Sequence, residues 1–331
     1  MSNEYDEFNS WKTLVYADKC RAILDGTFQA PVVLHVYPTN LCNSNCHFCI
    51  MRGERTHQAT LGRDVFERLM ESANAMGIKS LHVSGGGEPT LFKHLDLVAG
   101  FKGFKVLSTN GALLTPEAAS LFDRVRVSIN AGTARVHEIV TGTQNFQKVV
   151  FNFWAAKKAN PKVQMGLGFV VSDQNWEDIF NVCRLANELE ADFIHVRPAY
   201  CADPEADKKI REIIEPAYHL CEAARKFSKA RIFALSEKFD GCWNARKYTK
   251  CLATPLHAVV AATGELIVCQ DVFIRFGDLS RQSLGEVWGG PEHKAAIEKI
   301  ELGKCPRCVM VRPNEILQHV FRDNEIRMEM L

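Results

Sequence analysis

The sequence lacks several features that would assign it to a membrane, secreted or nucleic-acid-coating class. Its 331 residues hold no apolar run near the ~20 residues that a membrane-spanning helix needs. The opening stretch, MSNEYDEFNSWK, is polar and acidic, unlike a secretory signal. The net charge is only +1, which disfavours a broad basic surface for nucleic acid. We therefore expect a cytoplasmic protein with no membrane attachment, and its 47% apolar content is enough for a large core.

Cysteine is abundant and unevenly placed. Twelve cysteines would stay reduced in a cytoplasm. Five of them show no ligand-like spacing and are expected to be buried or free thiols: Cys20, Cys183, Cys201, Cys221 and Cys242. Three others, Cys42, Cys46 and Cys49, fall within eight residues. Three thiols leave both a disulfide set and a tetrahedral zinc site incomplete, whereas they suit a [4Fe–4S] cluster with one open iron. An incomplete zinc site is the alternative.

Strand-like and helix-like segments alternate along the first two thirds of the chain. The predicted strands are 32–37, 80–84, 105–109, 124–130, 163–171 and 193–197, the last of the series. The predicted helices are 62–77, about 91–100, one from Thr115, about 145–159 and about 176–190. This order predicts an α/β fold with a parallel sheet and right-handed crossovers. A charged helical region follows over about 204–229, and the tail after it shows little regular periodicity.

Four of these strands pair an apolar face with a polar one. In VVLHVY, for example, Val32, Leu34 and Val36 oppose His35 and Tyr37. A sheet covered on both faces would be apolar throughout, so the polar faces suggest a sheet that curls into a barrel around a polar lumen. An antiparallel sheet with its polar side in water is the alternative, disfavoured by the interleaved helices.

The motif Cys42-x3-Cys46-x2-Cys49, with Phe48 before the last cysteine, resembles the signature of the radical S-adenosylmethionine (SAM) superfamily. The resemblance implies a partial (βα)6 TIM-like barrel and a cluster that binds SAM at its open iron. The GGGEP segment at 85–89 resembles the family's segment for the methionine amino group, which implies roles for Gly86, Gly87 and Glu88. The family pattern further implies cofactor contacts from Phe48, Asn110, Ser128 and Asn130, and backbone contacts to adenine from 169–175.

The tail resembles an auxiliary-cluster domain of this superfamily. Cys251, Gly264, Cys269 and the segment 277–288 are similar to the start of the SPASM domain, and Cys305-x2-Cys308 closes the set. Because no cysteine follows Cys308, the tail is similar to the shortened "twitch" form with one auxiliary [4Fe–4S] cluster. A four-cysteine zinc site is the alternative. The predicted division is an N-terminal extension (1–31), a barrel (32–200), a helical bridge (201–240) and the twitch-like domain (241–331).

The resemblance implies an enzyme that reductively cleaves SAM to a 5′-deoxyadenosyl radical, which abstracts hydrogen from a substrate before oxidation or rearrangement. A small polar substrate of sugar, cyclitol or nucleoside type is favoured, with a flavodoxin- or ferredoxin-type electron donor. Peptide maturation is an alternative, disfavoured because only 31 residues precede the first strand. The lead-in at 18–49 resembles radical SAM proteins of phage base-hypermodification pathways, so a modified thymine in DNA is another alternative. A zinc-binding scaffold is the non-enzymatic one.

Candidate catalytic residues lie near the strand ends. Arg197 ends the sixth strand and would pair with the SAM carboxylate or with substrate. Tyr200 follows it, and Asp271, two residues after Cys269, is the preferred proton acceptor. His35, His82 and His195 share the polar face and could act as acids or bases, although a structural, hydrogen-bonded role is the simpler expectation.

Overall fold

The computed structural model describes residues 9–53, 55, 57–199, 204–239, 246–305, 308 and 310–322. Its strands form one sheet in the order β10-β9-β8-β1-β2-β3-β4-β5-β6-β7. The strands are β1 (Val33–Val36), β2 (Ser80–Val83), β3 (Phe104–Thr109), β4 (Arg124–Val127), β5 (Gln164–Val171), β6 (Phe193–Pro198), β7 (Arg231–Ala234), β8 (His257–Val260), β9 (Glu265–Cys269) and β10 (Val272–Asp278).

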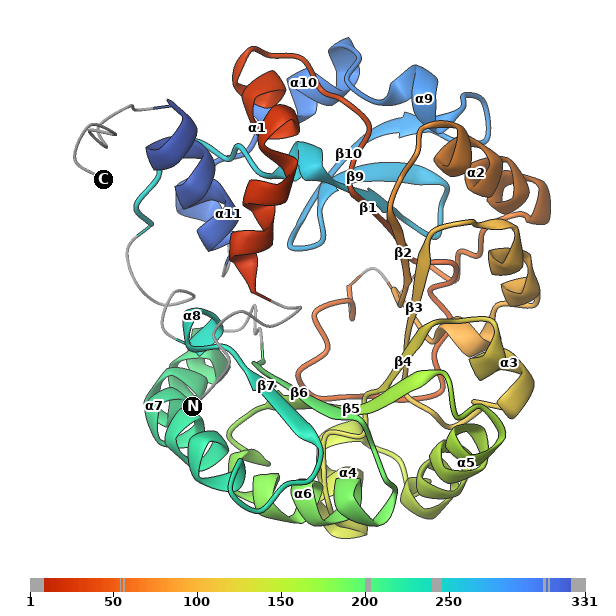
Figure 1. Cartoon of the computed structure of the whole chain (residues 1–331), viewed down its shortest axis with the longest axis vertical. Coiled ribbons are helices and arrows are strands. Elements are labelled where there is room, and N and C mark those ends of the chain that lie inside the picture. Colours follow the sequence, from red (N-terminus) through yellow and green to blue (C-terminus); the bar gives the residue numbers. More distant parts are fainter. Residues whose placement is uncertain are drawn as a thin grey trace.

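Strands β1 to β7 are parallel neighbours in chain order, as the strand–helix alternation predicted. Strand β8 adds to the free edge of β1 in parallel, and β9 and β10 continue the sheet in antiparallel fashion. Figure 1 shows the strands curving around a central space, with helices on the outside. The antiparallel alternative for the first six strands is therefore wrong.

The helices divide between the outer layer of the barrel and the segments around its open side. The α-helices are α1 (Ala17–Leu24), α2 (Arg63–Ala75), α3 (Pro116–Ser120), α4 (Ala134–Thr141), α5 (Phe146–Ala159), α6 (Ile179–Glu188), α7 (Pro204–Ala224), α8 (Ser236–Phe239), α9 (Leu284–Val287), α10 (Pro291–Glu298) and α11 (Val311–Glu315). Short 3-10 turns are η1 (Ser10–Tyr16), η3 (Pro89–Leu91), η4 (Leu95–Gly100), η5 (Trp176–Asp178), η6 (Thr254–Leu256) and η7 (Leu302–Lys304), and η8 (Ile316–Arg322) is π-helical. No described helix is long and apolar enough to cross a membrane.

Side-chain alternation along the strands explains why the sheet has one apolar and one polar face. Leu34, Leu81 and Val125 are completely buried beneath the outer helices. Helix α2 supplies a matching stripe, in which Phe66 and Leu69 are buried. The residues of opposite parity, among them His82 and Arg126, line the interior cavity instead. The predicted polar lumen is therefore present.

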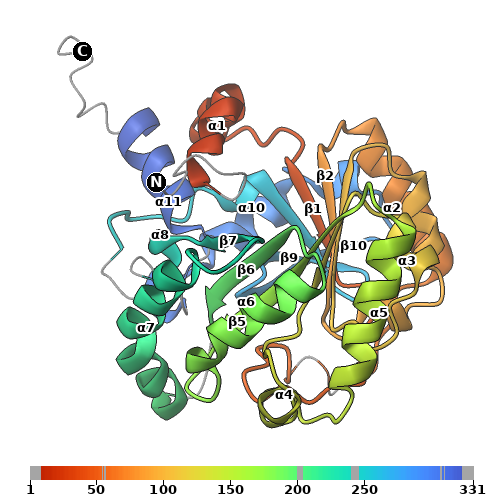
Figure 2. The same cartoon turned by 60° about the horizontal axis from the view of Figure 1, so that its bottom comes forward.

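Segments from both ends of the chain lie at the open side of the barrel. Helices α1 and α11 lie next to each other there in both views (Figures 1 and 2). Cys20 and Ile23 of α1 share a small apolar cluster with Leu252 before β8 and Leu317 of η8. This cluster connects the N-terminal segment to the cysteine-bearing tail.

The structure corrects three details of the predicted series. The strand at 193–197 is not the last, because β7 follows α7 and pairs with β6, and β8 extends the other edge. The segment 91–100 forms two 3-10 turns, not one helix. Helix α4 was not predicted. It is capped by Thr133, whose side chain accepts a hydrogen bond from the amide of Val136. Short elements with few residues leave a weak periodic signal in sequence.

Candidate active site

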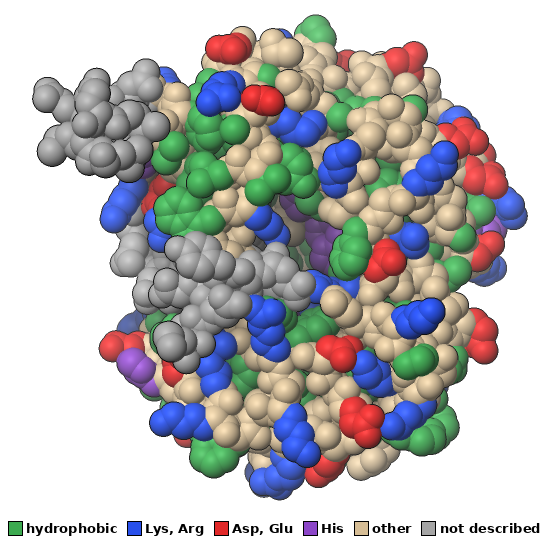
Figure 3. Space-filling view, in the orientation of Figure 1, with side chains coloured by type: hydrophobic (Ala, Val, Ile, Leu, Met, Phe, Trp, Pro, Cys, Tyr) green, Lys and Arg blue, Asp and Glu red, His purple; other side chains and the backbone are tan. Residues whose placement is uncertain are grey.

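A cavity occupies the lumen and extends to the loops at the carboxyl ends of the parallel strands. The three clustered cysteines, the GGGEP segment, and the polar ends of β3, β4 and β6 all contribute to its wall. Figure 3 shows the molecule hollowed near its centre, with histidine side chains visible inside. In barrel enzymes this end of the strands carries the chemistry.

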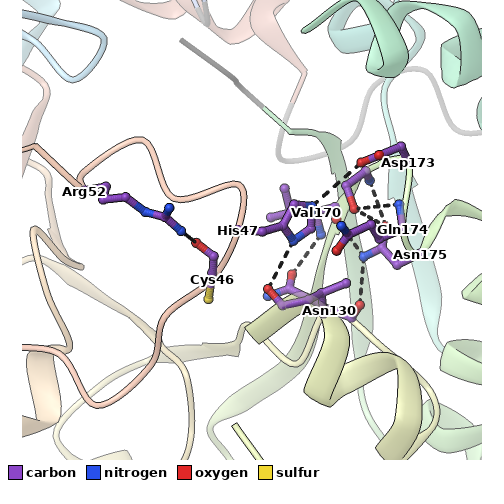
Figure 4. Close-up of polar contacts among 10 residues, drawn as sticks. Cys46, His47, Arg52, Asn130, Val170, Asp173, Gln174 and Asn175 are labelled. Atoms are coloured by element: carbon purple, nitrogen blue, oxygen red, sulfur yellow. Dashed lines mark hydrogen bonds and ion pairs between the residues drawn. The ribbon is translucent and has the colours of Figure 1, made fainter. Parts of the chain in front are cut away.

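The cysteine loop is held in place by several hydrogen bonds to neighbouring loops. The amides of Asn45 and His47 donate to the carbonyls of Thr141 (2.9 Å) and Val140 (3.2 Å) at the end of α4. Arg52 donates to the carbonyl of Cys46 at 2.9 Å (Figure 4). These bonds tie the loop to the end of α4 and hold its own turn together.

The arrangement of the three thiols suits ligands of one metal cluster better than three unrelated free cysteines. Cys42, Cys46 and Cys49 are half-buried and line the cavity. Burial and the neighbouring thiols raise the pKa of Cys46 to about 12, and burial raises the pKa of Cys42. No described His, Cys, Asp or Glu residues form a group of three around a single metal-ion position. Three thiols spread around a cavity suit a cluster that offers each thiolate its own iron.

An arginine that the motif does not include lies against this loop. Arg55 directs Nη1 toward the Sγ of Cys49 at 3.9 Å, and its Nη2 donates to the carbonyl of Ser44 at 2.8 Å. A guanidinium here offsets the negative charge that three thiolates would bring together. Only the structure identifies this residue, because its spacing from the cysteines carries no known signal.

The glycines of the GGGEP segment are required by contact with the cysteine loop. A Cβ on Gly86 would lie 2.1 Å from Oδ1 of Asn40, and one on Gly87 would lie 1.9 Å from the carbonyl oxygen of Leu41. The amides of Gly87 and Glu88 donate to the carbonyls of Thr39 and Leu41, both at 2.7 Å. The sequence had suggested close approach to a ligand, and here the close approach is to the loop that carries the thiols.

Glu88 joins the ends of β2 and β3. Its Oε1 accepts from the amide (3.1 Å) and hydroxyl (2.7 Å) of Thr90 and from the hydroxyl of Thr109 (2.5 Å). Its Oε2 accepts from the amide of Asn110 at 2.7 Å. Burial raises the pKa of this carboxyl, and the four donors oppose that shift. Oε2 keeps acceptor capacity for one more donor, such as the ammonium group predicted to bind here.

The other predicted cofactor contacts lie along the same wall. Asn110 donates from Nδ2 to Oδ1 of Asn43 (2.6 Å) and to Oγ of Ser44 (3.1 Å), so it orients the cysteine loop. Ser128 lines the cavity one strand further on, and Phe48 lines it from the loop. Their predicted contacts with SAM stay predictions.

Asn130 has a backbone conformation with φ of 58°, uncommon for a residue with a side chain. Its Oδ1 accepts from the amide of Val170 at 2.9 Å, and its carbonyl accepts from Nδ2 of Asn175 at 2.8 Å (Figure 4). These bonds fix the ends of β4 and β5 against each other. Nearby, Asp173 directs a carboxylate oxygen toward Nε2 of His47 at 3.8 Å.

The tail brings its four cysteines together. The pKa of Cys251 is raised to about 11 by burial and by the nearby Cys308 and Cys305, and the pKa of Cys269 is raised by burial, Asp271, Cys251 and Cys308. Amides of Asp271 and Met310 donate to the sulfurs of Cys269 (3.5 Å) and Cys308 (3.3 Å). These four residues would hold the auxiliary cluster.

Asn314 organises the peptide next to the first of these cysteines. It is completely buried, and its Oδ1 accepts from the amides of Leu252 (2.6 Å) and Ala253 (2.9 Å). Its Nδ2 lies 3.9 Å from the sulfur of Cys251. No motif or spacing in the sequence indicates this role.

The predicted catalytic residues fall in different places. Arg197 lines the cavity from β6. Asp271 is not among the described cavity-lining residues, but Gln270 beside it is. Burial raises the pKa of the Tyr37 phenol, and Asp271 lies close enough to add to that shift. Tyr200 lies outside the described residues, as do Cys201 and Cys242.

Comparisons with known proteins agree with this architecture. Residues 36–186 match the model of the radical SAM superfamily, and residues 251–309 match that of SPASM, an iron–sulfur cluster-binding domain. Residues 36–186 therefore form a radical SAM domain, and residues 251–309 form a SPASM-type domain. The two models imply SAM and a [4Fe–4S] cluster for the barrel and an auxiliary iron–sulfur cluster for the tail, which confirms the predicted cofactors.

The chain is 33% identical over 172 residues to the probable GTP 3′,8-cyclase of Saccharolobus islandicus and 32% identical to that of Saccharolobus solfataricus. Each match covers 49% of this chain and 55% of the relative, so the chain spans about half the length of these curated proteins.

Two solved structures share the fold. Streptococcus suis SuiB bound to its precursor peptide SuiA has a TM-score of 0.65 at 16% identity, covering 91% of this chain and 75% of SuiB. Native anSMEcpe with bound AdoMet has a TM-score of 0.60 at 17% identity, covering 81% and 83%.

Proposed function

We propose that this radical SAM enzyme reductively cleaves SAM and abstracts hydrogen from a small polar substrate held in the lumen. The supporting observation is that one cavity is lined by the cysteine loop and by a residue next to a tail cysteine. Cys42, Cys46 and Cys49 line it, and so does Gln270, which follows Cys269 directly. When bound, the first cluster supplies the electron that splits SAM into methionine and a 5′-deoxyadenosyl radical.

The residues of the chain would hold the reactants and shield them. Three thiolates of the cysteine loop bind the cluster, and Arg55 lowers their mutual repulsion. Oε2 of Glu88 accepts from the methionine ammonium while its other oxygen anchors the turn. The lumen walls restrict the radical to the substrate carbon that they place beside it.

A substrate of nucleoside type has the most support among the small polar options. The two Saccharolobus relatives, at 32–33% identity, are probable GTP 3′,8-cyclases, so the substrate in their name is a nucleotide. A peptide substrate is the second candidate, because SuiB, which shares the fold, was solved with a precursor peptide. A thymine modification in DNA stays a third, less favoured option. The match to an iron–sulfur domain model favours a cluster over zinc in the tail.

The reaction class follows from what the auxiliary cluster does. A nearby cluster with all its irons ligated could accept an electron from the substrate radical, which would give net oxidation. If the cluster serves only to position substrate, rearrangement would result. We propose an oxidoreductase or an isomerase on this basis, with a flavodoxin- or ferredoxin-type protein as electron donor.

The first test is SAM cleavage by anaerobically reconstituted, dithionite-reduced protein. We expect 5′-deoxyadenosine from the wild type and none from Cys42→Ala, measured by liquid chromatography. Cys183→Ala, a buried thiol on α6 outside both cysteine groups, is the matched control. Continued cleavage by the Cys42 variant would contradict the site assignment.

The second test addresses the auxiliary site. Cys305→Ala is expected to lower the iron content, while some uncoupled SAM cleavage persists. Iron and sulfide are measured against the same Cys183 control. Unchanged iron content would contradict an auxiliary cluster held by Cys305.

A further inference from the structure

The inner part of the lumen carries arginine and histidine side chains but few carboxylates. Arg126 of β4 and Arg197 of β6 line the cavity together with His35 and His82. Nη1 of Arg126 lies 2.7 Å from Nδ1 of His195. The one carboxylate among the described cavity-lining residues is Glu88, which already accepts four hydrogen bonds.

The imidazoles do not balance the arginine charge, and they add none of their own. Burial is the main cause that lowers the pKa values of His35, His82 and His195 well below the usual range, so these rings are neutral at pH 7. Burial, Arg197 and Arg124 lower the pKa of Arg126 to about 9, which leaves its guanidinium charged at neutral pH. Neutral His195 accepts the hydrogen bond from Arg126 at Nδ1 but does not cancel its charge.

Asp271 is not among the groups that shift the pKa of Arg126. The phenol of Tyr37 lies within electrostatic reach of both Asp271 and Arg197. Arg126 lies two strands away from Arg197 in the sheet and lines the same cavity. A buried charge without an opposite charge is unfavourable, so an occupant of the cavity that carries a negative charge would be favoured.

The neighbouring strand leaves space beside this guanidinium. At Gly168 of β5 a Cβ would lie 3.4 Å from Cγ and Cδ of Arg126 and 3.3 Å from Cα of Ser128. A larger side chain at this position would press on the Arg126 stem. The absence of a side chain at Gly168 lets Arg126 reach over β5 to His195 on β6.

A second, independent observation concerns His35. It is 4% exposed, its Nε2 lies 2.5 Å from Oγ of Ser84, and its ring stacks on that of His82 with 4.4 Å between centroids. Its Nδ1 is buried and has no hydrogen-bond partner among the described residues. In the Nδ1–H tautomer this atom needs an acceptor, and the described residues of the cavity wall do not provide one.

We propose that the substrate carries an anionic oxygen group, a carboxylate or a phosphate, which binds in the lumen to Arg126 and offers an acceptor to His35. This inference rests on the proposed function, and it narrows the substrate class to organic anions. A guanidinium fork matches the paired oxygens of either group.

The carboxylate of SAM is not the expected partner. Arg126 precedes Ser128 by two residues along β4, which places it about 6–7 Å further from the carboxyl end of the strand. The cysteine loop follows the carboxyl end of β1, so groups that bind its cluster stay at that level. Arg126 faces the part of the cavity beyond them.

Thermal-shift titrations of the reconstituted holoenzyme test the proposal. The probes are inorganic phosphate and acetate, with chloride at matched ionic strength and SAM present at saturation. We expect at least one of the two anions to stabilise the wild type, and the stronger one identifies the group. No stabilisation by either anion, or stabilisation that SAM abolishes, would overturn the proposal.

Variants of the arginine complete the test. Arg126→Gln should weaken the apparent affinity for the preferred anion at least ten-fold, and Arg126→Lys should restore part of it. Arg63→Gln, which removes an exposed guanidinium paired with Glu67 on α2, should leave the affinity unchanged. Equal affinities in the Arg126→Gln and Arg63→Gln variants would refute the role of Arg126.

SAM cleavage tests the proposed function, and anion binding tests the anion site independently of it. Wild-type protein that cleaves SAM but binds neither anion would keep the proposed function and lose the anion site. Wild-type protein that binds an anion without cleaving SAM would lose the proposed function instead.

Discussion

Replacing Glu88 by glutamine tests whether its carboxylate holds the cysteine loop through Asn110. The two oxygens of Glu88 each face a backbone donor, the amide of Thr90 at 3.1 Å and that of Asn110 at 2.7 Å. A glutamine has one oxygen and one NH2 group, so in either orientation a buried amide loses its acceptor. Loss of one charge-assisted hydrogen bond costs about 1.5–3 kcal/mol, and the stranded donor adds to it, so we expect about 3 kcal/mol.

The effect should reach the cofactor loop as well as the stability. Three donors surround the position of Oε1, so the glutamine oxygen would take that position and its NH2 group would face the amide of Asn110. The side chain of Asn110 binds Asn43 and Ser44 in the cysteine loop. We expect Glu88→Gln to lower the melting temperature of the holoenzyme by roughly 5 °C and to weaken SAM binding. Calorimetry gives the first value, and the SAM-induced change in the reduced cluster spectrum gives the second.

Glu67→Gln is the matched control, since Glu67 is exposed and pairs only with Arg63 across one helical turn among the contacts described. If Glu88→Gln melts at the temperature of this control and binds SAM as tightly as the wild type does, the reasoning from its four hydrogen bonds is refuted.

Two further predictions follow from the cysteine sites. Asn314→Ala leaves the buried amides of Leu252 and Ala253 without their acceptor, so it should lower the free energy of unfolding by about 2–5 kcal/mol and lower the iron content. Asn314→Asp keeps an acceptor and should retain more stability and more iron than Asn314→Ala. Equal iron content in the two variants would contradict this reasoning. Because the pKa of Cys46 is raised to about 12 and that of Cys42 is raised as well, these thiols must release protons when the cluster binds. Cluster retention against a chelator should therefore fall as pH drops from 8 to 6, about ten-fold per unit for each proton released, and a pH-independent loss of iron would contradict the argument.

The barrel could be predicted because the sequence shows two independent patterns, apolar–polar alternation within strands and helical periods between them. Leu34 and Val36 alternate with His35 and Tyr37, and helical periods separate each strand from the next. Alternation fixes which side chains face the lumen, and the interleaved helices fix parallel pairing. The alternation is missing from β7 and β8, each of which has three successive buried residues, and the place of β8 depends on pairing with an edge that lies far away in sequence.

The candidate site could be predicted only where residue type and spacing carry meaning. The spacing of Cys42, Cys46 and Cys49 indicates a cluster-binding loop whatever the fold around it. The GGGEP segment adds support because it follows the cysteines after one strand–helix unit. Arg55 and Asn314 act through single contacts whose geometry only the folded chain creates. The sequence also placed Arg126 on the polar face without a role, since its link to His195 spans 69 residues.

The placement of β8 explains how two cysteine groups, separated by some two hundred residues, come to be attached to one sheet. Val33 to Val36 pair with His257 to Val260, so the tail continues the sheet of the barrel. Strand β9 then directs Cys269 and Gln270 toward Tyr37 and the cavity. Because the hairpin is hydrogen-bonded to the strand that precedes the cysteine loop, a shift of β1 would move both cysteine groups together. A rigid connection of this kind suits chemistry in which a radical formed at one cluster must be resolved near the other before it escapes.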